Sequence, residues 1–158
     1  MNPVHYKSDK MDWETPPELF ARCNEKWGPF DLDVCALPHN AKCDAFYDPT
    51  YDGLRSPWFG TCWCNPPYKS EPGKWLAKAH AEVQAGRAKL VVALVASRTD
   101  NKWWHGYVMR PGVTVVFLAG RVRFVGADSS APFPSALVVI TADAHPVRVE
   151  TMAARGGA

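Results

Sequence analysis

The sequence has none of the long apolar runs that mark membrane proteins and little of the cysteine that marks secreted ones. No apolar run approaches the about 20 residues that a membrane helix needs. The first residues, MNPVHYKSDKMDW, contain no apolar core of a secretory signal. The 5 cysteines are odd in number and too sparse for a disulfide scaffold. These absences predict a cytoplasmic protein that does not bind a membrane.

A strong charge of either sign is also missing. The 18 Lys and Arg residues and the 16 Asp and Glu residues give a net charge of +2. Residues 1–79 carry 9 basic against 11 acidic side chains, a balance of −2, and residues 80–158 carry 9 against 5, a balance of +4. An acidic half could hold a cationic cofactor, and a basic half could face phosphates. The asymmetry is small, and ordinary surface scatter could also produce it.

The chain is long enough for one folded domain with a real core. It has 158 residues, 47% of them hydrophobic, and contains no repeat or interdomain linker. We predict a domain over residues 12–150, with flexible ends at 1–11 and 151–158. The composition leaves the oligomeric state open, and a monomer is possible.

Helical and strand patterns alternate along the chain. Thr15 and Glu18 form a T-x-x-E capping box, Pro16 suits the first helical position, and Gly28 ends this first helix. Two further helices are predicted at about 73–85 and 100–109. The predicted strands are 30–36, 58–64, 89–97, 113–119, 121–125 and 135–141. The alternation predicts an α/β open sheet, mostly parallel and covered by helices on both faces, with an antiparallel edge strand where loops join the last strands.

One predicted strand, 58–64, stops at the sequence Asn65-Pro66-Pro67-Tyr68. Two successive prolines remove two backbone donors and fix two φ angles, so no strand continues through them. The segment is either a stiff turn or a rigid backbone that presents an amide, a carbonyl and an aromatic ring to one planar ligand. The side-chain oxygen of Asn65 and a proline carbonyl could accept both hydrogens of an exocyclic amine. Tyr68 could stack on the base face, a contact worth about 1–3 kcal/mol.

A second group of polar residues lies at the end of another predicted strand. Asp31 and Asp33 in FDLDVCA are two residues apart, so both point to the same side of the strand predicted at 30–36. Ligands of open α/β sheets bind at the carboxyl ends of the strands. We therefore expect these carboxylates and the NPPY segment to share one crevice, although each could also be a solvated strand-end residue.

The cysteines support a different interpretation. Cys35, His39 and Cys43 are spaced by three residues, and Cys62 and Cys64 follow, so four of these side chains could bind a structural zinc ion. The spacing matches no common C-x2-C pattern, and buried free cysteine is the more usual outcome. The hypothesis is then a zinc-containing, non-catalytic nucleic-acid-binding module.

Several segments together resemble the phage-type DNA adenine methyltransferase (Dam) family. The matching segments follow the family's order over residues 12–140: DWETPPELF (12–20), FDLDVCA with NAKC (30–43), DGL (52–54), WCNPPY (63–68), ASRTDNKWWH (96–105), GRVRF (120–124) and APFPSALVV (131–139). The resemblance implies a compact Rossmann-like methyltransferase fold without a separate target-recognition domain. It also implies that S-adenosyl-L-methionine is the cofactor and the 6-amino group of adenine in double-stranded DNA is the target. The setting would be a phage or prophage protein in a bacterial cell. RNA or another substrate remains an alternative.

The resemblance also implies roles for individual residues. The catalytic motif is Asn65, Pro66, Pro67 and Tyr68. Residues expected at the cofactor are Thr15 and Pro16 for the methionine carboxylate, Asp33 for its ammonium, Asp44 or Asp48 for the ribose, Asp52 for the adenine amine, and Asp31, Cys35 and Ala36 beside them. Unlike the usual pattern, no F-x-G-x-G loop follows the first strand. No metal is implied.

Basic residues at the same end of the predicted sheet are candidates for contact with nucleic acid. They are Arg98, Lys102, Arg121 and Arg123. Arg121 and Arg123 share one face of RVRFV and could meet phosphates or bases. Each could also be an ordinary solvated surface charge.

Overall fold

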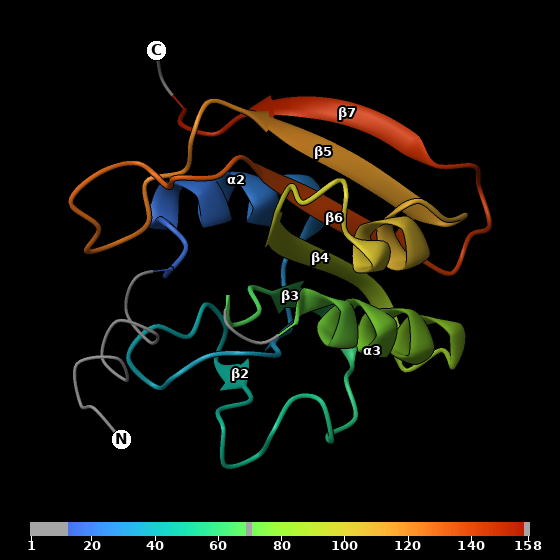
Figure 1. Ribbon diagram of the computed structural model, residues 1–158. Coiled ribbons are helices and arrows are strands. Elements are labelled where there is room, and N and C mark those ends of the chain that lie inside the picture. The colour runs from blue at the N-terminus through green and yellow to red at the C-terminus, as the bar shows by residue number, and fades with distance from the viewer. Residues whose placement is uncertain (1–12, 69–70, 157–158) are drawn as a thin grey trace.

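The computed structural model describes residues 13–68 and 71–156, which form a seven-stranded mixed sheet with helices on both faces (Figure 1). The helical elements are α2 (Pro17–Trp27), α3 (Pro72–Gln84) and the π-helical turn η1 (Trp104–Val108). The strands are β1 (Leu32–Asp33), β2 (Ala45–Phe46), β3 (Gly60–Cys64), β4 (Ala88–Ala96), β5 (Val113–Ala119), β6 (Ser135–Thr141) and β7 (Arg148–Ala153). The predicted α/β class with a Rossmann-like open sheet is confirmed.

The strand order is β2-β1-β3-β4-β6-β5-β7. Strands β2, β1, β3 and β4 run parallel, β6 is antiparallel to both of its neighbours, and β7 is parallel to β5. The antiparallel strand therefore lies inside the sheet, and its prediction as an edge strand was wrong. β6 has a continuously apolar, buried sequence that suits the interior, whereas β7 is mostly exposed, as an edge strand can be.

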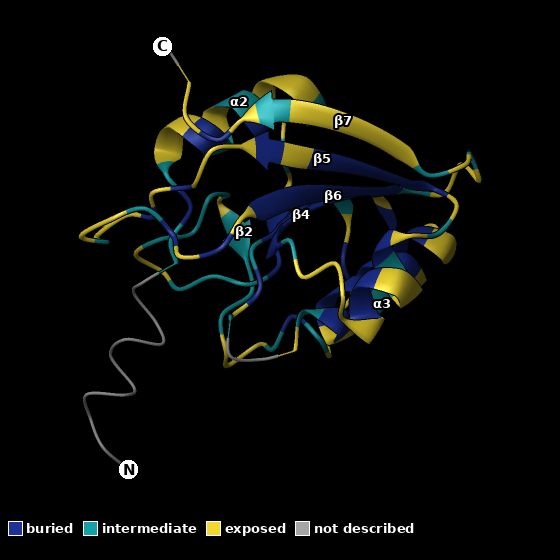
Figure 2. Cartoon of the chain, turned by 45° about the horizontal axis from the view of Figure 1, so that its top comes forward, coloured by how far each residue is buried: buried dark blue, intermediate teal, exposed yellow. Residues whose placement is uncertain are grey.

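Helices cover the two faces of the sheet with separate apolar layers. On one face, α3 places Leu76 in a cluster that contains Val91 of β4. On the other face, α2 places Leu19 and Cys23 in a cluster that contains Val92. Figure 2 shows β4 and β6 buried between these layers. Because both faces are covered, the central strands β1, β3, β4 and β6 are accessible to ligands mainly at their ends.

The start of α2 differs from the prediction. The helix begins at Pro17, and Pro16 is the N-cap residue without a side-chain cap hydrogen bond. The Thr15 hydroxyl does not cap the helix, because it accepts a hydrogen bond from Asn65 instead. Gly28 follows the last helical residue, as predicted.

Two further expectations were wrong near the end of the chain. Residues 121–125 form no strand, and Val125 makes only an isolated bridge to Glu14. The flexible end predicted from residue 151 is instead partly strand, because β7 continues to Ala153 and Ala154 is buried. The predicted flexible residues 1–11 lie outside the described residues. Within the described part of the chain, no helix is long and apolar enough to span a bilayer.

Candidate active site

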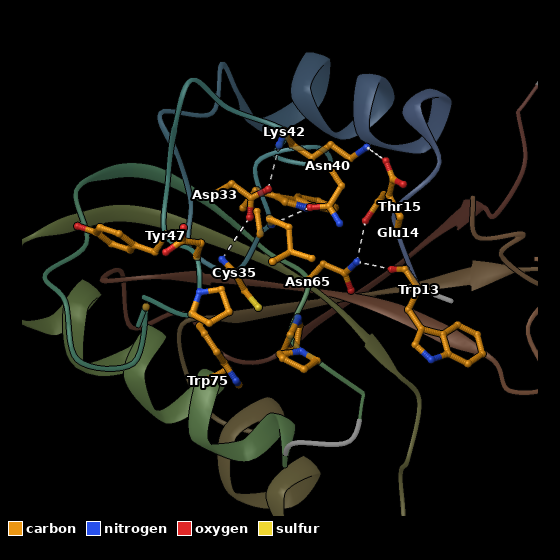
Figure 3. Close-up of a pocket in the computed structure, with 18 of the residues that line it drawn as sticks. Trp13, Glu14, Thr15, Asp33, Cys35, Asn40, Lys42, Tyr47, Asn65 and Trp75 are labelled. Carbon is orange, nitrogen blue, oxygen red and sulfur yellow. Dashed lines mark hydrogen bonds and ion pairs between the residues drawn. The ribbon is translucent and has the colours of Figure 1, made fainter. Parts of the chain in front are cut away.

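A cavity of about 440 Å³ lies at the carboxyl ends of β1, β2 and β3. Its walls come from Trp13–Thr15, from the loops after β1 and β2, from Asn65–Tyr68 after β3, and from Trp75 of α3 (Figure 3). Its volume lies within the ~300–1,000 Å³ of pockets that hold small molecules. The structure thus brings Asp33 and the NPPY segment to one cavity.

Two hydrogen bonds determine how the side chain of Asn65 is turned. Its Nδ2 donates to the backbone oxygen of Trp13 at 2.7 Å and to Oγ1 of Thr15 at 3.0 Å. A carbonyl oxygen cannot donate, so the amide nitrogen and not the oxygen must face Trp13. Oδ1 of Asn65 is buried and has no hydrogen-bond partner among the described residues. An unpaired buried acceptor is costly, and here it belongs to a residue of the cavity wall.

Tyr68 lies in an aromatic cluster with Trp13, Phe124 and Phe133. Its ring stacks on Phe133 with centroids 5.2 Å apart and planes at 29°, and the Trp13 ring is tilted against it at 5.2 Å. The Tyr68 hydroxyl is buried without a hydrogen-bond partner in the described part of the chain, and burial raises the pKa of this phenol. A base that stacks on the Phe133 side of Tyr68 must therefore displace Phe133.

Asp33 ends β1 with its carboxylate buried at 2% exposure. Oδ1 accepts a hydrogen bond from the amide of Cys35 at 3.2 Å, and Oδ2 accepts one from the amide of Lys42 at 3.0 Å. Burial raises the pKa of Asp33 to about 6, although these two amides stabilise the charged form. The cavity thus contains a carboxylate that would gain from a positive partner.

The same carboxylate organises the loop that follows β1. This loop has no glycine-rich sequence, yet both of its ends, at Cys35 and Lys42, bond to Asp33. Within the loop, Oδ1 of Asn40 accepts a hydrogen bond from the amide of Leu37 at 2.8 Å. Side-chain acceptors therefore replace glycine flexibility in shaping this part of the wall.

The turn at Asp52 and Gly53 closes another side of the cavity. Asp52 has a φ of 52°, in the left-handed region, and its Oδ1 accepts from the amide of Leu54 at 3.0 Å. A Cβ at Gly53 would clash with the backbone oxygen of Val34, so this close approach requires glycine. Asp52 consequently both shapes the turn and lines the cavity.

The structure separates the two candidates for the ribose. Asp48 follows β2 and lines the cavity, whereas Asp44 is exposed and lies outside it. Oδ1 of Asp48 accepts from the amides of Thr50 and Tyr51 at 3.0 and 3.2 Å. These bonds hold one carboxylate oxygen in place at the cavity wall.

Other predicted cofactor residues divide between the cavity and its surroundings. Thr15, Cys35 and Ala36 line the cavity. Asp31 and Pro16 are not among its lining residues. Oδ2 of Asp31 accepts from the amide of Thr61 at 2.8 Å near the start of β3, so Asp31 stabilises the opposite end of the sheet.

A smaller cavity of about 140 Å³ shares Pro66 and Tyr68 with the larger one. Arg98, which follows β4, also lines it, and its guanidinium carbon lies 5.5 Å from the centre of the Phe133 ring. Lys102 is exposed and lines neither cavity. Of the basic candidates, Arg98 is therefore the one beside the NPPY segment.

The other two basic candidates lie over the loop at 127–134. Arg121 donates to the backbone oxygen of Ala131 at 3.2 Å, and Arg123 donates to that of Asp128 at 3.4 Å. Both side chains belong to exposed residues. They brace the loop that carries Phe133, a role that the sequence analysis did not predict.

The structure gives no support to the zinc hypothesis. In residues 13–68 and 71–156, no three His, Cys, Asp or Glu side chains are grouped as metal ligands would be. Burial raises the pKa of Cys35, Cys43 and Cys62 to about 12, so without a metal these thiols are neutral.

Several residues of the cavity wall were not assigned a role from the sequence. They are Trp13, Glu14, Asn40, Lys42, Tyr47, Leu54 and Trp75. Trp13 and Glu14 belong to DWETPPELF, and Asn40 and Lys42 belong to NAKC, so the segments that carry the family resemblance already contained them. Lys42 and Glu14 form an ion pair, Nζ to Oε1, at 3.6 Å (Figure 3).

Comparison with known proteins identifies relatives over most of the chain. The family described as DNA N-6-adenine-methyltransferase (Dam) matches residues 4–151. A "DNA N-6-adenine-methyltransferase" of Haemophilus phage HP1 (strain HP1c1) is 33% identical over 125 residues, which cover 78% of this chain and 71% of the relative. A protein of the same name from Escherichia phage T1 is 35% identical over 75 residues, or 46% of this chain and 31% of the relative.

Proposed function

This chain belongs to the DNA N-6-adenine-methyltransferase (Dam) family, and we propose that it transfers a methyl group from S-adenosyl-L-methionine to the 6-amino group of adenine in double-stranded DNA. Its phage relatives suggest that it acts in a bacterial host cell. One observation carries the catalytic assignment: both hydrogens of the Asn65 amide are used inside the protein, and its buried oxygen is left unpaired.

The larger cavity suits S-adenosyl-L-methionine, which supplies a methyl group on a positively charged sulfur. Asp33 offers a buried carboxylate to the ammonium of the methionine portion, since a cation would offset the cost of burying that charge. Asp48 follows β2, where an acidic residue commonly holds ribose hydroxyls. Asp52 also lines this cavity, where its carboxylate would accept a hydrogen bond from the adenine amine of the cofactor.

The target adenine, which must leave the DNA stack to be reached, would lie against Pro66 and Tyr68, which line both cavities, and beside Asn65 at the wall of the larger one. Oδ1 of Asn65 and the backbone oxygen of Pro66 would accept the two amine hydrogens. Two acceptors raise the electron density on the nitrogen and stabilise the positive charge that develops there. Arg98 lines the smaller cavity, next to Pro66 and Tyr68, and would meet the DNA backbone beside the extruded base.

Transfer of a labelled methyl group to plasmid DNA tests the proposal directly. We expect the wild-type protein to label DNA but not RNA, with the label on the 6-amino group of adenine. Asn65→Ala should abolish transfer while S-adenosylhomocysteine binding, measured by calorimetry, stays within about threefold of wild type. Gln84→Ala is the matched control, because it removes an exposed amide at the end of α3.

Two results would contradict the proposal. Absence of label in DNA from a folded protein that binds S-adenosylhomocysteine would exclude DNA as the substrate. Normal turnover by Asn65→Ala would show that the Asn65 oxygen does not hold the target amine.

A further inference from the structure

A short segment before α2, Trp13–Thr15, contacts two side chains of the catalytic motif, Asn65 and Tyr68. The Trp13 backbone oxygen and the Thr15 hydroxyl accept from Asn65 (Figure 3), and the Trp13 ring lies 5.2 Å from that of Tyr68. We call Trp13–Thr15 the positioning segment. It is separated from Asn65 by 50 residues in sequence, so these contacts depend on the whole fold.

The positioning segment is itself held in place. The backbone oxygen of Glu14 accepts from the amide of Val125 at 3.0 Å, and these residues form a bridge. The Glu14 carboxylate pairs with Lys42 of the loop after β1. Thr15 is 1% exposed, so its hydroxyl is buried together with the hydrogen bond that it accepts from Asn65. An acceptor held in this way can orient another side chain.

The orientation of Asn65 matters because its two ends have opposite hydrogen-bonding character. The terminal torsion of an asparagine is broad, and turning it by half a circle exchanges oxygen and nitrogen. The exchanged form would present two donors to an amine that itself donates. The Trp13 carbonyl disfavours this form, because it cannot donate and an oxygen would face an oxygen. The Thr15 hydroxyl can accept or donate, so it contributes a second bond that holds the amide in the orientation selected by Trp13.

We propose that Thr15 is a positioning residue that keeps the Asn65 oxygen directed toward the target amine; this inference rests on the proposed function. Thr15 does so by using Oγ1 as the second acceptor for Nδ2, at 3.0 Å. The assignment differs from both expectations for Thr15, as a helix cap and as a ligand of the cofactor carboxylate. In this assignment Thr15 affects methyl transfer by orienting Asn65, and it does not contact a substrate itself.

Two substitutions at Thr15 isolate the hydroxyl. Thr15→Val keeps the size of the side chain and removes the acceptor, and Thr15→Ser keeps the acceptor. Thr151→Val is the matched control, since Thr151 lies in the edge strand β7 and its hydroxyl donates to the backbone oxygen of Phe117 in β5, away from the cavity. We expect Thr15→Val to lower kcat about tenfold to a hundredfold, in line with the loss of a well-placed group. Thr15→Ser should keep kcat near the wild-type value. S-adenosylhomocysteine affinity should stay within about threefold in all three variants.

Nuclear magnetic resonance tests the orientation without relying on catalysis. In wild-type protein labelled with nitrogen-15 at asparagine, and assigned with Asn65→Ala, both Asn65 side-chain amide protons should exchange slowly with water. One should give a nuclear Overhauser effect to the Thr15 methyl group. Thr15→Val should accelerate exchange of that proton, and Thr15→Ser should not.

The two measurements separate this inference from the proposed function. A wild-type protein with a fast-exchanging Asn65 amide and no contact to Thr15 overturns the positioning role, even if DNA is methylated and even if Thr15→Val does not fold. Unchanged kcat in folded Thr15→Val also overturns it. A large loss of S-adenosylhomocysteine affinity in Thr15→Val would assign Thr15 to the cofactor instead. Protected amide protons in a protein that does not methylate DNA would leave the geometry intact and contradict only the function.

Discussion

Replacing Asp33 by Asn should change the pH dependence of stability in a predictable direction. Burial raises the Asp33 pKa from 3.8 to about 6 in the folded protein, which corresponds to about 3 kcal/mol. Because the folded-state pKa is raised, this contribution to stability is present below pH 3.8 and is lost as the pH rises through about 6. The asparagine side chain of the variant does not titrate, so the variant's free energy of unfolding should not decrease in this way as the pH rises.

About 2 kcal/mol of this change should appear between about pH 4.5 and 7.5, because the unfolded state is already largely ionised at the lower value. Over this range, Asp33→Asn should gain that amount relative to wild type. At every pH it also loses one of the two bonds to the amides of Cys35 and Lys42, at about 1–3 kcal/mol. Urea unfolding at both pH values measures the difference, with Asp44→Asn as the exposed control. An equal pH dependence in wild type and Asp33→Asn would refute the reasoning.

The same ionisation should control binding of the cofactor's ammonium. In the wild type, S-adenosylhomocysteine affinity should fall about tenfold per pH unit below about pH 6, because the ammonium pairs with the ionised carboxylate of Asp33. Methylthioadenosine lacks the amino-acid portion and should bind with little pH dependence. Calorimetric titrations from about pH 5 to 7.5 compare the two ligands. Parallel curves for both ligands would remove Asp33 from the ammonium site.

Three further predictions concern the two cavities. Asp48→Asn should weaken S-adenosylhomocysteine binding about tenfold in a calorimetric titration while Asp44→Asn does not, because only Asp48 lines the larger cavity; equal affinities would leave the ribose site unassigned. Tyr68→Phe should keep stability and most methyl transfer in single-turnover assays, because the hydroxyl is unpaired, whereas Tyr68→Ala should lose most transfer; equal losses would show that the hydroxyl matters. Arg98→Ala should weaken DNA binding and reduce the salt dependence of the affinity by about one ion, and an unchanged salt dependence would place Arg98 away from phosphate.

The order of elements could be predicted from local patterns, but their pairing could not. The apolar run of β4 and the amphipathic pattern of α3 were recognisable because both are long and regular. β7 was not, because its sequence, RVETMA, is polar and its six residues are held mainly by backbone pairing with β5. Without β7, no sequence signal could show that β6 lies between β4 and β5 and not at the edge.

The candidate site was predictable where a strand end and a polar residue coincide. Asp33 ends β1 and Asn65 follows β3, so the rule for open α/β sheets brings them together. Asp31 fails this rule because it precedes β1 and bonds near the start of β3. The choice between Asp44 and Asp48 depended on a strand of two residues, β2, which is too short to give a periodic signal.

Thr15 shows why a correct local rule can still give the wrong partner. The T-x-x-E pattern predicts a cap, and a cap of this type stabilises a helix by about 1 kcal/mol. The protein forgoes that bond, and Pro16 becomes the N-cap residue without a side-chain bond. The Thr15 hydroxyl instead satisfies a buried amide donor of Asn65, whose oxygen then remains unpaired. Both choices reduce the stability of the protein without ligand, since a helix end and a buried acceptor are left without these partners. An arrangement that gives up stability at two adjacent points is expected where the missing partner is a substrate, because the target amine would satisfy the acceptor on binding.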